Sequence, residues 1–273
     1  MFIRSVLVIF YVLFCVRLIT PPWWFFKLNR RYYDHAKGIY SKQSINDLIP
    51  ARFRLNQWFE AVGSEPTAYP VFVKPEWGQN SKGVVRINNL GQLQAMRATA
   101  FVAQGRPLLV QEAATGAIEY EVFAIANAHN ASEYACLSIT QVVNEQQTEL
   151  PINGIHNPNT SYLDITYQFS PDELKALWVM LLEVGQFRVC RFGIKAHNRI
   201  QLLAGEFKII EINLLLPMPM VLLTSNTTLI KKIHLALSYA WRMALATQGI
   251  KRSPLYPPRA KDGLVSVINE VGD

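Results

Sequence analysis

Glu211 and Asn213 stand one residue apart at the end of a short apolar segment. On a β-strand, alternate residues share a face, so the side-chain oxygens of both would point the same way. A carboxylate and an amide oxygen suit Mg²⁺, which prefers oxygen ligands and keeps phosphate and water in its other positions. The alternative is a strand-terminal glutamate in an ordinary ion pair, because an unpaired carboxylate after an apolar run would be costly. The spacing makes this pair a candidate Mg²⁺ site.

A lysine beside a glycine-bounded loop is the second candidate feature. Residues 69–75 read as a short apolar strand that contains Lys74 near its end, and a polar loop follows. An ammonium group beside flexible backbone suits a polyphosphate, since glycines let N–H groups approach its oxygens closely. The loop residues concerned are Gly78, Gln79, Asn80, Ser81 and Gly83. Lys-Pro pairs and glycine-rich hairpins are common, so this feature alone is weak evidence.

The third feature is a second apolar strand, residues 107–112, which ends in Gln111 and Glu112 and opens into Ala-Ala-Thr-Gly. Such a strand end can present backbone C=O and N–H groups to the edge of an adenine ring. A nearby acid, Glu119 or Glu121, could bind ribose hydroxyls. An ordinary strand with a solvent-facing acid explains the segment equally well when it is taken alone.

Strands and helices must position these residues, and the pattern of apolar, polar and turn residues predicts both kinds of element. Ser170-Pro171-Asp172-Glu173 predicts a helix start, with serine as N-cap, proline at the first position and glutamate three residues later. Apolar alternation and turn residues predict strands over 84–87, 120–126, 192–196 and 207–212 and helices over 89–98, 170–184 and 228–246. Strand–loop–strand–helix units followed by paired strands indicate an α+β fold.

The composition favours a globular protein and gives no sign of nucleic-acid binding. Hydrophobic residues make up 50% and charged residues 17%, which excludes a disordered chain. The net charge is +7, but the basic residues are spread along the chain except for one group, so nucleic acid is not expected as a partner. The three cysteines form no CxxC pair and predict neither a zinc site nor a disulfide framework.

The N-terminal segment, residues 1–30, is expected to contact a membrane. It has no charge from Ser5 to Val16, and Arg17, two prolines and the aromatic run 23–26 follow. A bilayer-spanning helix needs about 20 apolar residues, so the segment either spans with help from its flanks or lies at the interface; a buried helix of the fold is the alternative. Basic residues after it would face the cytoplasm, and no small-residue cleavage site follows. We therefore expect the segment to hold the protein at a membrane, with the main domain in the cytoplasm.

The order of these motifs resembles the ATP-grasp superfamily, which includes D-alanine–D-alanine ligase and other carboxylate–amine ligases. The resemblance covers about residues 69–220, and within the superfamily it is closer to bacterial membrane-associated, D-alanine–D-alanine-ligase-like proteins. Tyr40-Ser41-Lys42, Leu48-Ile49-Pro50 and Arg191-Phe192 add to it. It implies an ATP-grasp domain over 66–250, with the nucleotide between two α+β lobes, a helical linker over 31–65 and a tail over 251–273.

The resemblance also implies a role for each matched residue. Lys74 would contact the α- and β-phosphates of ATP under the loop 78–83, with Lys42 as a second phosphate-binding lysine. Gln111, the Glu112 carbonyl and the Ala114 amide would bind adenine. Ribose would be bound by Glu119, charge on the transferred phosphoryl group would be stabilised by Arg191, and Mg²⁺ would be held by Glu211 and Asn213.

This chain departs from the family pattern in ways that leave its activity open. Gly193 stands where the family usually has a metal-binding acid two residues after the arginine, and no lysine occurs between Lys82 and Lys175. The loop after Asn213 is apolar, and the N-terminal segment replaces the usual substrate domain. We expect an ATP-dependent ligase that joins an unknown carboxylate to an unknown nucleophile through an acyl phosphate. A degenerate nucleotide-binding sensor or scaffold, or a membrane module without nucleotide, are the alternatives.

Overall fold

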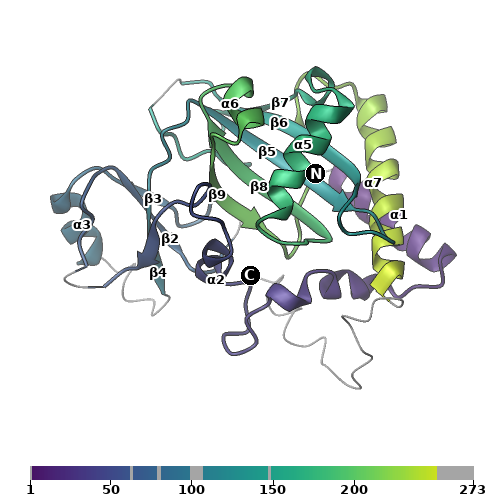
Figure 1. Ribbon diagram of the computed structural model, residues 1–273, viewed down its shortest axis with the longest axis horizontal. Helices are drawn as coiled ribbons and strands as arrows, with labels where there is room; N and C mark the ends of the chain where they lie inside the picture. Colours follow the sequence, from purple (N-terminus) through teal and green to yellow (C-terminus); the bar gives the residue numbers. More distant parts are fainter. Residues whose placement is uncertain (1, 62–63, 79–80, 99–106, 147–148, 251–273) are drawn as a thin grey trace.

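Two antiparallel sheets form the frame of the molecule, each with its own helices (Figure 1). The computed structural model describes residues 2–61, 64–78, 81–98, 107–146 and 149–250. The smaller sheet has the strand order β1-β4-β2-β3 and the larger one β7-β6-β5-β8-β9. This arrangement confirms the expected α+β class.

The small sheet carries Lys74 on the face opposite its own core. Its strands are β1 (Gln57–Phe59), β2 (Val71–Pro75), β3 (Val85–Ile87) and β4 (Leu108–Glu112). Val71 and Val73 are buried with Leu93 of α3 (Leu90–Arg97) on one face. Residues between them point the other way because side chains alternate along a strand. Lys74 is therefore directed away from α3 and towards the large sheet.

The large sheet separates an apolar face from a polar one. Its strands are β5 (Ile118–Ala126), β6 (Tyr134–Asn144), β7 (Thr160–Asp164), β8 (Val189–Ala196) and β9 (Lys208–Asn213). Tyr120, Val122 and Ala124 face the main core under α5 (Pro171–Leu182) and α6 (Arg199–Ala204). Ser170 and Glu173 form a complete capping box at the start of α5, as the sequence predicts. The residues that alternate with this apolar set share the opposite face.

Strand register gathers the candidate residues on that second face. Glu121 on β5 pairs with Gly193 on β8, and Gly193 pairs with Glu211 on β9. Arg191 pairs with Asn213 one step further along the same two strands. Directly paired residues point to the same side of a sheet, so three neighbouring strands contribute to one polar surface.

The N-terminal helix α1 (Phe2–Arg17) packs against the C-terminal helix α7 (Leu229–Gly249), and the two lie side by side in Figure 1. Four residues of α1 are buried in a cluster that also contains Phe123 and Val189 of the large sheet: Ile3, Leu7, Tyr11 and Cys15. The helix therefore belongs to the fold, as the alternative interpretation had it. Among the described residues, no helix is long and apolar enough to cross a bilayer, so the predicted transmembrane helix is not found.

Several elements lie outside the sequence prediction. Strands β1, β6 and β7 and helix α6 are not anticipated by the pattern. The stretch 31–65 is only partly helical: it holds α2 (Lys42–Asp47), and β1 within it joins the small sheet. Single-turn helices are η1 (Pro22–Lys27), η2 (Arg30–Tyr32), η3 (Thr166–Gln168) and η4 (Met220–Leu223). The predicted tail, 251–273, lies outside the described residues.

Candidate functional site

A cleft lies between the two sheets, with about 950 Å³ of empty space that is partly open to solvent. This volume lies within the range of ordinary small-molecule pockets, about 300–1,000 Å³, so the cleft is large enough for a nucleotide. Of the residues singled out from the sequence, nine line it: Lys74, Ser81, Gln111, Glu112, Ala114, Glu119, Glu121, Arg191 and Glu211. A second cavity shares its Lys74 end and is lined in addition by Lys42, Gly78 and Asn213. Gly83 lines neither cavity, and Gln79 and Asn80 lie outside the described residues.

Lys74 is a buried ammonium group without an acidic partner. It is 7% exposed, and its Nζ donates to Oε1 of Gln111 at 2.9 Å and to the carbonyl oxygen of Ile210 at 3.4 Å. Within the described ranges it forms no salt bridge. Burial, together with the charge of Lys42, lowers the pKa of Lys74 to about 7 despite the opposing effect of Glu211. A buried cation held in this way fits an anionic ligand that the protein itself does not supply.

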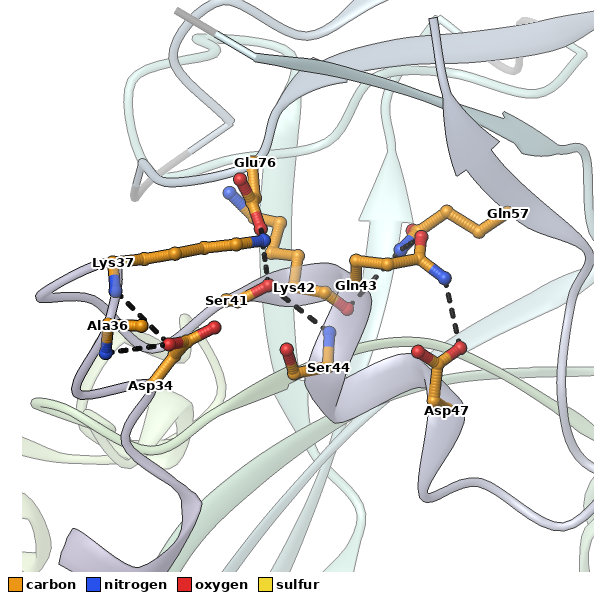
Figure 2. Close-up of polar contacts among 10 residues, drawn as sticks. All are labelled: Asp34, Ala36, Lys37, Ser41, Lys42, Gln43, Ser44, Asp47, Gln57 and Glu76. Atoms are coloured by element: carbon orange, nitrogen blue, oxygen red, sulfur yellow. Dashed lines mark hydrogen bonds and ion pairs between the residues drawn. The ribbon is translucent and has the colours of Figure 1, made fainter.

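Lys42 stands at the first turn of α2, next to Ser41 (Figure 2). Its Nζ donates to the carbonyl oxygens of Pro75 and Gly78, both at 3.0 Å. The turn is fixed by Ser41, whose hydroxyl caps α2 and also donates to Glu76. Burial lowers the pKa of Lys42, although the carboxylates of Glu211 and Glu76 oppose this. The structure thus brings a second lysine to the same cavity.

The residues expected around the nucleoside are partly engaged with each other. Nε2 of Gln111 donates to the carbonyl oxygen of Ile210 at 3.3 Å, and its Oε1 is held by Lys74. Oε2 of Glu119 accepts from Nδ2 of Asn153 at 3.0 Å, and burial raises the pKa of this glutamate. The first contact joins β4 to β9 across the cleft, and the second joins β5 to the loop before β7.

Arg191 links two carboxylates on neighbouring strands. Its Nε lies 2.9 Å from Oε2 of Glu121 on β5, and its Nη2 lies 3.3 Å from Oε1 of Glu211 on β9. The side chains of Arg191 and Glu121 are 13% and 9% exposed, so solvent screens this pair little. Burial raises the pKa of Glu121, whereas the charge of Arg191 lowers the pKa of Glu211 against the effect of burial. The guanidinium is thereby held at the floor of the cleft.

The donor set at the end of β9 fits a Mg²⁺ ion that keeps ligands from its substrate. Nδ2 of Asn213 donates to Oε1 of Glu211 at 2.8 Å, which directs the Asn213 carbonyl oxygen elsewhere. The two residues offer a carboxylate and an amide oxygen on one face, as the sequence predicts. In the part of the chain that is described, no group of three acidic, histidine or cysteine side chains lies close enough to hold a metal ion. A Mg²⁺ ion bound by these two residues would need further oxygen ligands from phosphate and water.

Gly193, between Arg191 and the bulge of β8, stands where the family pattern has an acid, and a side chain there would be crowded by its neighbours. A Cβ atom at this position would lie 3.0 Å from Cγ1 of Ile210 and 3.1 Å from Cγ of Glu211. Both contacts are tighter than those of ordinary Cβ atoms. A side chain at position 193 would therefore require Ile210 and Glu211 to shift.

Three residues that the sequence interpretation does not assign also line the cleft: Asn153, Tyr162 and Lys195. Asn153 and Tyr162 come from the hairpin of β6 and β7, which carries no motif. The sequence offers Glu121 only as an alternative ribose ligand, but in the structure it pairs with Arg191. Glu119 and Glu121 are alternate residues of one strand, and this spacing indicates that they share a face.

No protein-family model matches the chain, and no curated protein matches its sequence. Its structure is similar to that of the VanG D-Ala:D-Ser ligase from Enterococcus faecalis, with 14% identity and a TM-score of 0.51 over 76% of this chain and 61% of that one. The D-alanine–D-alanine ligase from Bacillus anthracis matches at 13% identity and a TM-score of 0.49 over 76% and 65%, and the L-amino acid ligase from Bacillus licheniformis at 15% and 0.45 over 74% and 47%.

The chain spans between 47% and 65% of the length of these three solved structures. At such low identity the likeness concerns the fold, and for the D-Ala:D-Ser ligase it extends over most of the described chain. By its fold, the chain resembles the D-Ala:D-Ser ligase, which agrees with the ATP-grasp resemblance of its sequence motifs.

Proposed function

We propose that the chain binds ATP and Mg²⁺ in the cleft and uses ATP to join a carboxylate to an amine or a related nucleophile. The carboxylate oxygen would take the γ-phosphoryl group and ADP would leave; the nucleophile would then attack the acyl carbon, and phosphate would leave as the new bond forms. The observation that carries the proposal is the pair of lysines, Lys74 and Lys42, which lack acidic partners among the described residues and share a cavity with Glu211 and Asn213.

Each of these side chains would then have a defined task. The ammonium groups of Lys74 and Lys42 neutralise phosphate oxygens, and Glu119 binds a ribose hydroxyl. Arg191, oriented by Glu121 and Glu211, stabilises charge on the group in transfer. Glu211 and Asn213 would hold Mg²⁺, which when bound neutralises charge on the phosphates. Both substrates would meet in one site, which lowers the entropic part of the barrier.

The substitution Glu211→Gln tests the metal part of this proposal. It removes a carboxylate but keeps a side chain of the same shape, so we expect ATP to bind with an affinity that no longer responds to Mg²⁺. Calorimetric titration of ATP with and without Mg²⁺ measures this, with Glu206→Gln on the adjoining loop as a control. Equal Mg²⁺ enhancement in the variant and the parent would contradict the assignment.

A second candidate function is nucleotide binding without turnover, and the crowding at Gly193 favours it. With Ile210 and Glu211 packed over the position of the missing acid, the chain has one metal-binding carboxylate fewer than a typical family member. Phosphoryl transfer depends on positioning and charge neutralisation, so a sensor or scaffold would bind ATP and release no ADP. Measurement of ADP release with a panel of acids and amines, beside ATP-dependent thermal stabilisation, separates the two functions.

We further propose that the domain works at the cytoplasmic face of the bacterial inner membrane, with α1 lying on the bilayer. The support is an apolar surface on α1, formed by its exposed side chains Val8, Ile9, Val12, Leu13 and Val16. Basic residues that follow the helix, among them Lys27 and Arg31, would contact anionic headgroups.

The double substitution Val12→Asp/Val16→Asp tests the membrane proposal. It places two charges on the apolar surface of α1, so we expect at least tenfold weaker binding to anionic vesicles, since each buried apolar side chain contributes about 1.5–3 kcal/mol. Vesicle flotation of the full chain measures the effect. The control is Val179→Asp, at an exposed valine on α5; equal flotation of all three proteins would argue against this surface.

A further inference from the structure

A third cavity adjoins the Arg191 end of the cleft and involves the N-terminal helix. It has about 630 Å³ of empty space, partly open to solvent, and it shares Arg191, Met220 and Ile155 with the cleft and Asn213 with the second cavity. Its remaining lining comes from Arg4 of α1 and from the loop after β9: Leu215, Leu216 and Met218. The cavity therefore lies next to the residues that would handle the γ-phosphate.

The exposed lining is more polar than apolar: Arg4, Arg191 and Asn213 are its polar residues, and the other lining residues form a smaller apolar part. Its charged side chains are two arginines, Arg4 and Arg191, and no acid lines it. Arg191 is already balanced by Glu121 and Glu211. Arg4 has no salt-bridge partner in the described ranges. Burial raises the pKa of Tyr162, and the positive charges of Arg191 and Arg4 oppose this rise. Both guanidinium groups therefore lie near the Tyr162 phenol. The cavity thus keeps one uncompensated positive charge.

The loop after Asn213 forms much of the apolar part of the cavity lining. Leu215, Leu216 and Met218 come from the Leu-Leu-Leu-Pro-Met-Pro stretch, which departs from the family pattern. Together with Met220 and Ile155, these side chains offer an apolar surface beside the arginines. Such a wall suits a hydrocarbon group, and no acidic residue of the described chain lines the cavity to pair with the ammonium group of a small zwitterion such as alanine.

From this geometry we infer that the cavity binds the acid substrate, and that this substrate is a monocarboxylate with an apolar chain. Its carboxylate lies between Arg4 and Arg191, and its chain lies against the loop after β9. Helix α1 thus supplies a substrate-binding residue. The inference rests on the proposed ligase function for the role of the acid, but binding of the acid itself needs no nucleotide.

Calorimetric titration of the full chain with acetate, butyrate, hexanoate and octanoate tests the inference. We expect the affinity to rise by up to about fourfold for each buried methylene, and alanine to bind more weakly than butyrate. Arg4→Gln should weaken octanoate binding on the order of tenfold to hundredfold, because it removes a charged hydrogen-bonding partner. Arg17→Gln, at an exposed arginine of the same helix, is the control and should bind octanoate like the parent.

The same experiments distinguish failure of this inference from failure of the proposed function. If the parent shows no chain-length dependence, or if Arg4→Gln binds octanoate as the parent does, the inference is overturned, whereas ATP-dependent stabilisation of the same proteins still supports the nucleotide site. If ATP does not bind but octanoate binding depends on Arg4, the cavity assignment holds and the ligase function fails. Should Arg4→Gln unfold, Arg4→Lys and the chain-length series on the parent still decide the question.

Discussion

Replacement of Lys74 by methionine is expected to abolish measurable ATP binding while leaving the free protein at least as stable as the parent. The ammonium group is buried and has no acidic partner in the described part of the chain, and in the proposed site it would neutralise the α- and β-phosphates. Loss of a desolvated charge partner costs roughly 2–5 kcal/mol of binding free energy. Methionine fills a similar volume, and replacement of buried ionic groups by apolar ones is often neutral or stabilising by about 1–4 kcal/mol.

This combination of effects separates a binding role from a structural one. Thermal unfolding with and without ATP and Mg²⁺ gives both quantities in one experiment. Lys175→Met, at an exposed lysine on α5 on the far side of the large sheet, is the matched control and should retain the ATP-dependent shift. If Lys74→Met lowered the stability of the free protein and kept the shift, the lysine would serve the fold and not the nucleotide.

The lowered pKa of Lys74 adds a dependence on pH to the same prediction. In the free protein this pKa is about 7, and a bound polyphosphate would raise it. Below pH 7 the lysine is protonated in both states, so binding takes up no proton there. Above pH 7 the free lysine loses its proton and must regain it on binding, which weakens ATP by up to about tenfold per pH unit. Titration in buffers of different ionisation enthalpy measures the uptake, and Lys74→Met should show none.

The sequence predicts the elements that carry strong local signals and misses those that depend on distant partners. The α5 start, with Ser170, Pro171 and Glu173, is defined by residues that contact each other within one turn. Strands β6 and β7 acquire their place through pairing with β5, and no local motif marks them. The same holds for β1, a three-residue strand whose existence depends on β4.

The candidate site divides in a similar way. The spacing of Glu211 and Asn213 alone places them on one face of a strand, and Lys74 stands just before its loop in the sequence. The relative positions of these residues can therefore be predicted from the sequence. The closeness of Arg4 to Arg191, and the pairing of Arg191 with Glu121, follow from how α1 and three strands pack. The apolar N-terminus shows the limit most clearly: its hydrophobic run predicts a membrane contact, yet one side of it is buried against α7.

The substitution Arg191→Met is expected to lower the free energy of unfolding by about 3–5 kcal/mol, because it leaves the carboxylate of Glu121 buried without its cation. Addition of Glu121→Gln should recover most of this loss, since a neutral amide needs no counter-charge. Urea unfolding of the parent, both single variants and the double variant gives the coupling energy directly. As a control, Arg52→Met breaks the exposed pair with Glu183, whose side chains are 58% and 41% exposed, and should change stability by less than about 1 kcal/mol.

The pH dependence gives this prediction its sign. Burial already raises the pKa of Glu121 above that of an unfolded glutamate, and loss of Arg191 raises it further. A carboxyl group with a raised folded pKa favours the folded state at low pH, and that contribution is lost as pH rises through the folded pKa. The deficit of Arg191→Met should therefore be smaller near pH 7 than near pH 10, on the two sides of the folded pKa of about 8, and the double variant should show a weaker trend because Glu211 also loses its cation. A deficit that is equal at both pH values would mean that Glu121 does not depend on Arg191, and that the guanidinium is positioned by Glu211 alone.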